Sequence, residues 1–297
     1  MSLQRSSYQF NQVSSVNDVK DKGIGLKRVL SFLKAGSLFI TLIIFLLPFI
    51  LIVMNSFKTT QQFVENPFSF PESFKSDNFI NAFNSMDFSR GFLNSIIITM
   101  VSTIFIIIFS SMTGYLFARF KWKINKILFF TILSSMTLPF QVLMIPLVKI
   151  YGELGLLNMR STLIFMHIGF MVPFGIFLFH GFIKGIPFEL EEAAFIEGCS
   201  RFKTFFLVVF PLLKPIIVTL CILDVLAIWN DYLLPSLILQ SPELRTLPLS
   251  VFSFFSSYSV DFAPLMAGLI MTIIPVLVLY LLLQKYIIKG ITQGALK

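Results

Sequence analysis

Long apolar runs separated by shorter polar segments make up most of this chain. Six runs have no charge or almost none, and they cover residues 37–57, 92–118, 127–148, 161–183, 212–240 and 263–284. Each has about 20 residues or more, enough for a helix to cross a hydrocarbon core of roughly 30 Å. Strands of a membrane barrel would be about half as long and would alternate apolar with polar residues. The pattern therefore predicts an all-α integral membrane protein with six transmembrane helices.

The third apolar run is the least regular of the six. Pro139 and Pro146 interrupt it, and Gln141 lies between them. Proline removes a backbone donor and kinks or breaks a helix, and a polar residue inside a span usually faces a cavity or another helix. We therefore expect a kinked helix near a cavity or a partner, with Gln141 as a candidate for a solute pathway.

The distribution of basic residues predicts how the spans are oriented. With six spans both termini lie on one side, and 17 of the 23 Lys and Arg residues fall on that side. Basic loops are retained in the cytoplasm, so both termini are predicted to be cytoplasmic. The chain then divides into a cytoplasmic N-terminal segment (1–36), a six-helix membrane domain (37–290) with a cytoplasmic loop at 184–212, and a cytoplasmic tail (291–297).

Composition and motifs argue against several functions. Charged residues make up only 13% of the chain, about half the share in a typical soluble domain. The net charge of +8 is accounted for by basic cytoplasmic loops, so no nucleic-acid partner is expected. No GxxxxGK[ST] phosphate loop is present, and the two histidines, His167 and His180, have no metal-binding motif near them. We therefore expect no catalysis and no metal or cofactor bound by this chain.

The predicted cytoplasmic loop contains a short charged helix. Pro187 suits the first turn of a helix, and Glu189 and its two neighbouring glutamates favour the positive N-terminal end of the helix dipole. Gly198 is well placed to end this helix, and Ser200 can cap the next one.

Small and apolar residues occupy the middle of this short helix. Ala193 and Ala194 lie between Leu190 on one side and Phe195 and Ile196 on the other. A solvated connecting helix is one interpretation, but it gains nothing from such a surface. A helix that docks into a partner groove lined with basic groups is the interpretation we favour.

The same loop resembles the cytoplasmic EAA loop of ABC importer permeases. The matching residues are Glu192, Ala193, Ala194, Gly198 and Pro211. Val208 and Phe210 occupy positions where that family more often has Ile and Leu. Six other stretches resemble sugar-importer permeases in family order; they are FLNSIIITM (92–100), GYLFARFKWK (114–123), LPFQVLMIPL with GLLN (138–158), AIWNDYLLPSLIL (227–239), RTLPLSVFSF (245–254) and QKYIIKGITQGALK (284–297). The last of these resembles the tail of the second permease subunit of maltose-type carbohydrate importers.

This resemblance implies a heteromeric importer in a bacterial cell membrane. It implies a second, different permease subunit, two ATP-binding-cassette ATPases that bind ATP and Mg, and an extracytoplasmic solute-binding protein. The residues it implies for coupling to the ATPases are Glu191, Glu192, Ala193, Ala194, Glu197, Gly198 and Pro211. Those it implies for contact between the C-terminal tail and the ATPases are Gly290, Thr292 and Gly294.

Polar residues near the fifth span are further candidates for the solute pathway. Asp224 lies within the span, and Trp229, Asn230 and Asp231 lie one to two turns further along. Tryptophan and polar groups together suit sugar stacking and hydroxyl hydrogen bonds, but a structural or subunit-interface cluster is the more ordinary role. We expect Asp224 to pair with a polar group on a neighbouring helix or on the partner subunit.

The resemblance favours a sugar or oligosaccharide as the solute. A polyol or a glycerol phosphate remains open as an alternative. A self-contained secondary transporter is a third possibility, but it predicts internal repeats and ion-binding acids in both halves of the chain. Asp224 and Asp231 have no counterpart in the first half.

Overall fold

Four helices in the described part of the chain are long and apolar enough to cross a membrane. The computed structural model describes residues 31–74, 76–255 and 260–295, with the side chains of 283 and 285–295 left aside. The four helices are Ser31–Asn55, α4 (Phe88–Arg119), α7 (Arg160–Lys184) and α14 (Phe262–Ala295). In α14, the part long and apolar enough to span is Phe262–Leu282. They match the first, second, fourth and sixth predicted spans.

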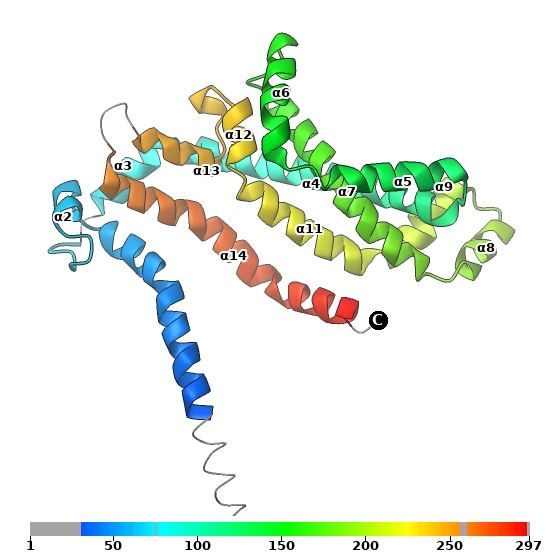
Figure 1. Cartoon of the computed structure of the whole chain (residues 1–297), viewed down its shortest axis with the longest axis horizontal. Helices are drawn as coiled ribbons and strands as arrows, with labels where there is room; N and C mark the ends of the chain where they lie inside the picture. Colours follow the sequence, from blue (N-terminus) through cyan, green and yellow to red (C-terminus); the bar gives the residue numbers. More distant parts are fainter. Residues whose placement is uncertain (1–30, 75, 256–259, 296–297) are drawn as a thin grey trace, which may run out of the picture.

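The third predicted span is broken into two helices. α5 (Lys123–Ser135) and α6 (Phe140–Glu153) meet at an angle of 96°. The bend lies just before Pro139, whose ring disfavours a helical conformation for the residue preceding it, while Pro146 lies inside α6. A bend was predicted, but it is a right-angled break rather than a kink, and Figure 1 shows α6 projecting from the bundle.

The fifth predicted span, 212–240, is wrong as a single helix. Its main part is α11 (Lys214–Trp229), and a bend of 75° separates α11 from the helical stretch Arg201–Leu212. α12 (Leu233–Ile238) is a separate short helix. The carboxylate of Asp231 explains the break, because its Oδ1 accepts hydrogen bonds from the backbone N–H groups of Leu233 (3.0 Å) and Leu234 (3.4 Å). The prediction of six spans therefore holds if each bent pair is counted as one.

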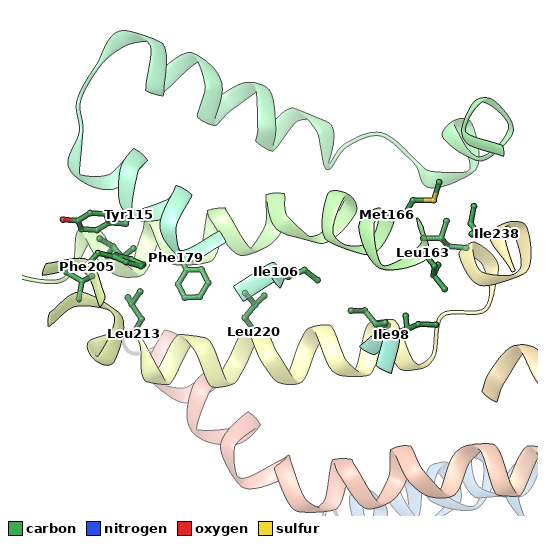
Figure 2. Close-up of a cluster of buried hydrophobic side chains, with 14 of the residues drawn as sticks. Ile98, Ile106, Tyr115, Leu163, Met166, Phe179, Phe205, Leu213, Leu220 and Ile238 are labelled. Carbon is green, nitrogen blue, oxygen red and sulfur yellow. The ribbon is translucent and has the colours of Figure 1, made fainter. Parts of the chain in front are cut away.

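α4 and α7 form the most extensive helix–helix contact of the bundle. Small residues let the two backbones approach closely. A Cβ added to Gly114 of α4 would lie 2.8 Å from Cβ of Phe179 and 3.1 Å from the backbone nitrogen of His180 on α7. The buried apolar cluster beside this contact runs along the bundle, from Tyr115 and Phe205 at one end to Met166 and Ile238 at the other (Figure 2).

Short helices close the end of the bundle that lies opposite α8. They are α2 (Thr60–Glu65), α3 (Asp77–Ser85), the 3₁₀ helices η2 (Pro242–Leu244) and η3 (Val251–Phe254), and α13 (Leu247–Ser250). Asn94 of α4 fastens this layer, because its Nδ2 donates to the carbonyls of Glu243 and Arg245 at 3.0 Å each. Lys58 is also buried here and donates to the carbonyl of Asn66 at 3.0 Å, and burial lowers its pKa.

The helix Ser31–Asn55 stands apart from the other long helices (Figure 1). Every residue from 31 to 50 is exposed, and the apolar window of this helix has no buried share. A helix that is apolar all round and unburied needs lipid or another subunit around it.

Candidate functional site

α8 (Glu189–Ile196) lies beyond the end of α7, at one end of the bundle (Figure 1). Phe188 is its N-cap residue, so Pro187 precedes the helix instead of occupying its first turn as predicted. Glu189, Glu191 and Glu192 do occupy the first turn, where the helix dipole favours negative charge.

The end of α8 is as predicted and is sharply defined. Gly198 has a φ of +83°, a conformation that glycine adopts without a steric penalty. The N–H of Cys199 donates to the carbonyl of Ala194 (2.9 Å) and that of Gly198 to the carbonyl of Phe195 (3.0 Å), the pair of bonds that defines a Schellman motif. Ser200 then caps α9 (Arg201–Thr204) by accepting from the Lys203 N–H. These hydrogen bonds therefore fix the direction in which the chain leaves α8.

The two faces of α8 differ in what they contact. Glu191 and Ala194 are buried against the rest of the chain. The exposed residues of the helix and its C-cap are Glu189, Leu190, Glu192, Ala193, Ile196 and Glu197. Ile196 is 87% exposed. The exposed face therefore combines a small, apolar centre with acidic neighbours, as a docking helix requires.

Glu191 fastens α8 to the end of α4. Its side chain is 1% exposed, its Oε2 accepts a hydrogen bond from the Tyr115 hydroxyl at 2.7 Å, and its Oε1 accepts from Nε of Arg119 at 2.6 Å. Arg119 also donates from Nη2 to the carbonyl of Ile186 at 2.9 Å, and its guanidinium lies over the ring of Phe188. We call Glu191, Tyr115 and Arg119 the α4–α8 latch.

This latch corrects the sequence-based grouping of Glu191 with Glu192. Glu192 is exposed, whereas Glu191 points into the chain's own interior and has no surface to offer a partner. Tyr115 and Arg119 were not singled out from the sequence. The sequence does place a basic stretch beginning at Arg119 on the same predicted side of the membrane as the acidic helix. Nothing in that stretch shows that Arg119, and not another basic residue, pairs with Glu191.

The chain after α9 turns into the membrane through an irregular helix. The π-helix η1 (Phe205–Val209) is followed by α10 (Phe210–Leu212), and α11 begins at Lys214. Pro211 lies in the first turn of α10 and is exposed. In this position it marks the bend between the loop and α11, where its missing N–H interrupts the helical ladder.

The proposed pathway residues do not converge on one site. Gln141 is exposed on α6, and Asn230 is exposed and donates from Nδ2 to the carbonyl of Leu226 at 2.7 Å. Trp229 packs edge-on against Phe92. Among the described residues, Oδ2 of Asp224 is buried without a hydrogen-bond partner, so the expected pairing is not found within this part of the chain.

Asp231 has a partner that sequence analysis treated as an ordinary packing residue. Nε2 of His167 on α7 lies 3.1 Å from Oδ2 of Asp231. The contact joins α7 to the turn between α11 and α12, while the other carboxylate oxygen accepts from the first N–H groups of α12. Asp231 thus has a structural role in the fold, and no periodicity in the sequence indicated its pairing with His167.

The long apolar helices of this bundle are those of a multi-pass membrane protein. Residues 106–293 match the family model described as the inner membrane component of binding-protein-dependent transport systems, and the chain belongs to this family. The family is one of ABC importer permease subunits, which are generally non-catalytic and work with ATPase and solute-binding proteins.

Three known proteins illustrate the similarity. The probable starch degradation products transport system permease protein AmyC of Thermoanaerobacterium thermosulfurigenes is 45% identical, over 84% of this chain and 91% of that protein. The melibiose/raffinose/stachyose import permease protein MelC of Bacillus subtilis is 36% identical, over 84% and 91%. A solved bacterial ABC transporter involved in alginate import has the same fold in one chain, with a TM-score of 0.76, 24% identity, and coverage of 87% of this chain and 96% of that one.

Proposed function

We propose that this chain is one of two different permease subunits in a bacterial cell-membrane importer for sugars or oligosaccharides. The names of its relatives support the solute class, since AmyC is named for starch degradation products and MelC for melibiose, raffinose and stachyose. These relatives favour a saccharide over a polyol or a glycerol phosphate. Membership of a binding-protein-dependent family also argues against a self-contained secondary transporter.

The exposed face of α8 is the observation that supports coupling to an ATPase. Ile196 is 87% exposed beside Ala193 and Leu190, with Glu192 and Glu197 at its margins. Apolar surface gains free energy when a partner covers it, and the acidic residues suit a groove lined with basic groups. Two partner ATPases bind ATP and Mg in this proposal, and their closure moves α8.

The α4–α8 latch gives this movement a route into the membrane domain. A displacement of α8 is passed to Glu191 and from there to Tyr115 and Arg119 at the end of α4. α4 in turn packs along α7. In this proposal, Glu192, Ala193, Glu197 and Gly198 form or shape the contact surface, while Glu191, Ala194 and Pro211 hold it in position.

The C-terminal residues Gly290, Thr292 and Gly294 form a second proposed contact with the ATPases. They lie in α14, but their side chains are outside the described residues. A C-terminal truncation after Lys289 provides their test. We expect it to lower ATPase retention in the purified complex.

Reconstitution of the complete importer tests the proposed function. Proteoliposomes that contain both permeases and the ATPases should take up radiolabelled saccharide only with ATP and the loaded binding protein. Transport by this chain alone, without ATP, would overturn the proposal. Melting-temperature shifts of the cognate binding protein with a saccharide, polyol and glycerol phosphate panel would identify the solute.

Two substitutions test the coupling role of α8 directly. Glu192→Lys reverses an exposed charge, and Gly198→Pro cannot adopt the φ of +83° that ends the helix. Both should lower transport and transport-linked ATP hydrolysis while the chain is still inserted in the membrane. Lys149→Glu, an exposed charge reversal on α6, is the matched control. Full coupling in both α8 variants would show that α8 is not the coupling element.

A further inference from the structure

A cavity of about 440 Å³ lies where α4 ends, α5 begins and α7 ends. Its volume is within the range of roughly 300–1,000 Å³ that small-molecule sites occupy. It lies at the same end of the bundle as α8, because α7 leads directly into the loop that contains α8. The coupling surface of α8 does not line it.

Four lysines line this cavity without a single carboxylate. Lys121 comes from the connection between α4 and α5, Lys123 and Lys126 from the first turn of α5, and Lys184 from the last turn of α7. All four are exposed, and the ion pairs found among the described residues involve none of them. Unpaired cations gathered around one cavity attract an anion.

Most of the other residues that line the cavity are aromatic. Phe117, Trp122 and Phe130 are among the lining residues, with Trp122 60% and Phe130 58% exposed. Aromatic side chains and long basic side chains together are typical of the boundary between hydrocarbon and water. The ligand that this lining fits is therefore anionic at one end and apolar at the other.

Exposed apolar side chains also cover the face of α5 that turns away from the cavity. Ile124, Ile127 and Leu128 are 54%, 61% and 44% exposed, and Asn125 is the only buried residue of this helix. Phe130, which lines the cavity and is itself exposed, lies one helical turn from Ile127, so this hydrocarbon surface reaches the edge of the cavity. This continuity distinguishes a lipid from a soluble anion such as free phosphate.

Contacts within the chain fix the connection between α4 and α5 that lines the cavity. Asn125 is buried, and its Nδ2 donates to the carbonyl of Phe120 at 2.9 Å, which fixes the connection between α4 and α5. The guanidinium of Arg201 lies 4.8 Å from the ring centre of Phe120 and supports the same connection from α9. The N-terminal end of α5, with its partial positive charge, faces this region as well.

We propose that this cavity binds the phosphate headgroup of an anionic phospholipid, whose acyl chains lie along the exposed face of α5. Basic pockets between transmembrane helices bind such headgroups in other membrane proteins. The lysines would contact the phosphate, and the aromatic residues would pack against the glycerol and the upper acyl chain. The bound lipid would support the junction of α4, α5 and α7 next to the α8 loop.

Native mass spectrometry of the full chain in detergent tests this proposal. We expect phosphatidylglycerol to be retained at a lower concentration than phosphatidylcholine. Lys123→Gln with Lys126→Gln should weaken phosphatidylglycerol binding at least tenfold and leave phosphatidylcholine binding unchanged. Lys149→Gln with Arg160→Gln removes the same charge from exposed positions outside the cavity, and we expect less than a twofold effect.

Two further measurements separate the lipid from other occupants. A photoreactive phosphatidylglycerol should label wild-type peptides within 117–130 or 180–184, and this result does not depend on any variant folding. Inorganic phosphate at millimolar concentration should not displace the lipid. The proposal is overturned by equal effects of the two double variants, by labelling elsewhere, by displacement with phosphate alone, or by cross-linking of this cavity to another subunit in the assembled importer.

Discussion

Two buried carboxylates in this chain have opposite surroundings. Glu191, at the α8 end of the bundle, is 1% exposed and accepts hydrogen bonds from Tyr115 and Arg119. Asp224, in α11, is 3% exposed, and its Oδ2 has no partner among the described residues. Since burying an unpaired charge is costly, the two groups cannot have the same role.

The two carboxylates differ in whether the described part of the chain supplies their hydrogen-bond partners. The α4–α8 latch is complete within one chain, so α8 is held in place before any ATPase binds. The carboxylate of Asp224 lacks such donors in the described part of the chain, which is the condition expected of a group that meets another subunit or remains protonated.

Glu191→Ala should have the largest effect. It leaves the guanidinium of Arg119, only 11% exposed, without its charged partner, and breaking a buried pair in this way costs about 3–5 kcal/mol. Chemical denaturation of the purified chain would measure the loss. Glu192→Ala is the matched control one residue away on the exposed face, where a substitution changes stability by about 0.5 kcal/mol or less. Equal losses in the two variants would show that no latch exists.

Gly114→Ala should come next, because it acts on the helix end that bears the latch. The new Cβ would lie 2.8 Å from Cβ of Phe179 and 3.1 Å from the backbone of His180. Overpacking of this kind costs about 1–3 kcal/mol. Gly181→Ala on α7 has nothing within 4 Å of the new Cβ, so it should be neutral or stabilising, since alanine favours a helix over glycine by about 1 kcal/mol. A shared loss in thermal stability would contradict the close contact of α4 and α7.

The difference between local and long-range features also decides how much the sequence could predict. Gly198 and Ser200 were predicted in their correct roles because a helix end depends on residues only a few positions apart. The pairing of Arg119 with Glu191 joins residues 72 positions apart, and no periodicity identifies which of several basic and acidic residues meet. The sequence therefore predicted the local helix end but not which distant residues pair in the fold.

The same limit applies to the spans. Unbroken apolar runs predicted α4 and α7 closely, because hydrocarbon requires a helix wherever such a run crosses it. Run length contains no information about helix direction, so the 96° turn between α5 and α6 could be expected only as a kink. The end of α11 at Trp229 was missed because nothing in the apolar run showed that Asp231 would accept hydrogen bonds from the start of α12.

Asp231→Ala tests the structural role of this carboxylate and should have an intermediate effect. It removes the acceptor for the N–H groups at the start of α12 and the partner of His167 Nε2. Loss of a capping side chain costs about 0.5–2 kcal/mol. Asp231→Asn retains an oxygen acceptor and should recover most of the stability in thermal unfolding. If transport falls equally in both variants while stability is unchanged, Asp231 acts on the solute and not on the fold.

Asp224→Asn should have the smallest effect on the isolated chain. No donor in the described residues holds its Oδ2, and exchanging the carboxylate for an amide also removes the cost of a charge inside a membrane span. We expect a change in the free energy of unfolding of less than about 1 kcal/mol, against a much larger loss for Glu191→Gln. The same variant in the assembled importer gives the sharper result: weaker retention of the second permease would identify that subunit as the missing partner. A loss in the isolated chain as large as that of Glu191→Gln would mean that Asp224 is already paired within the chain, and the contrast between the two carboxylates would fail.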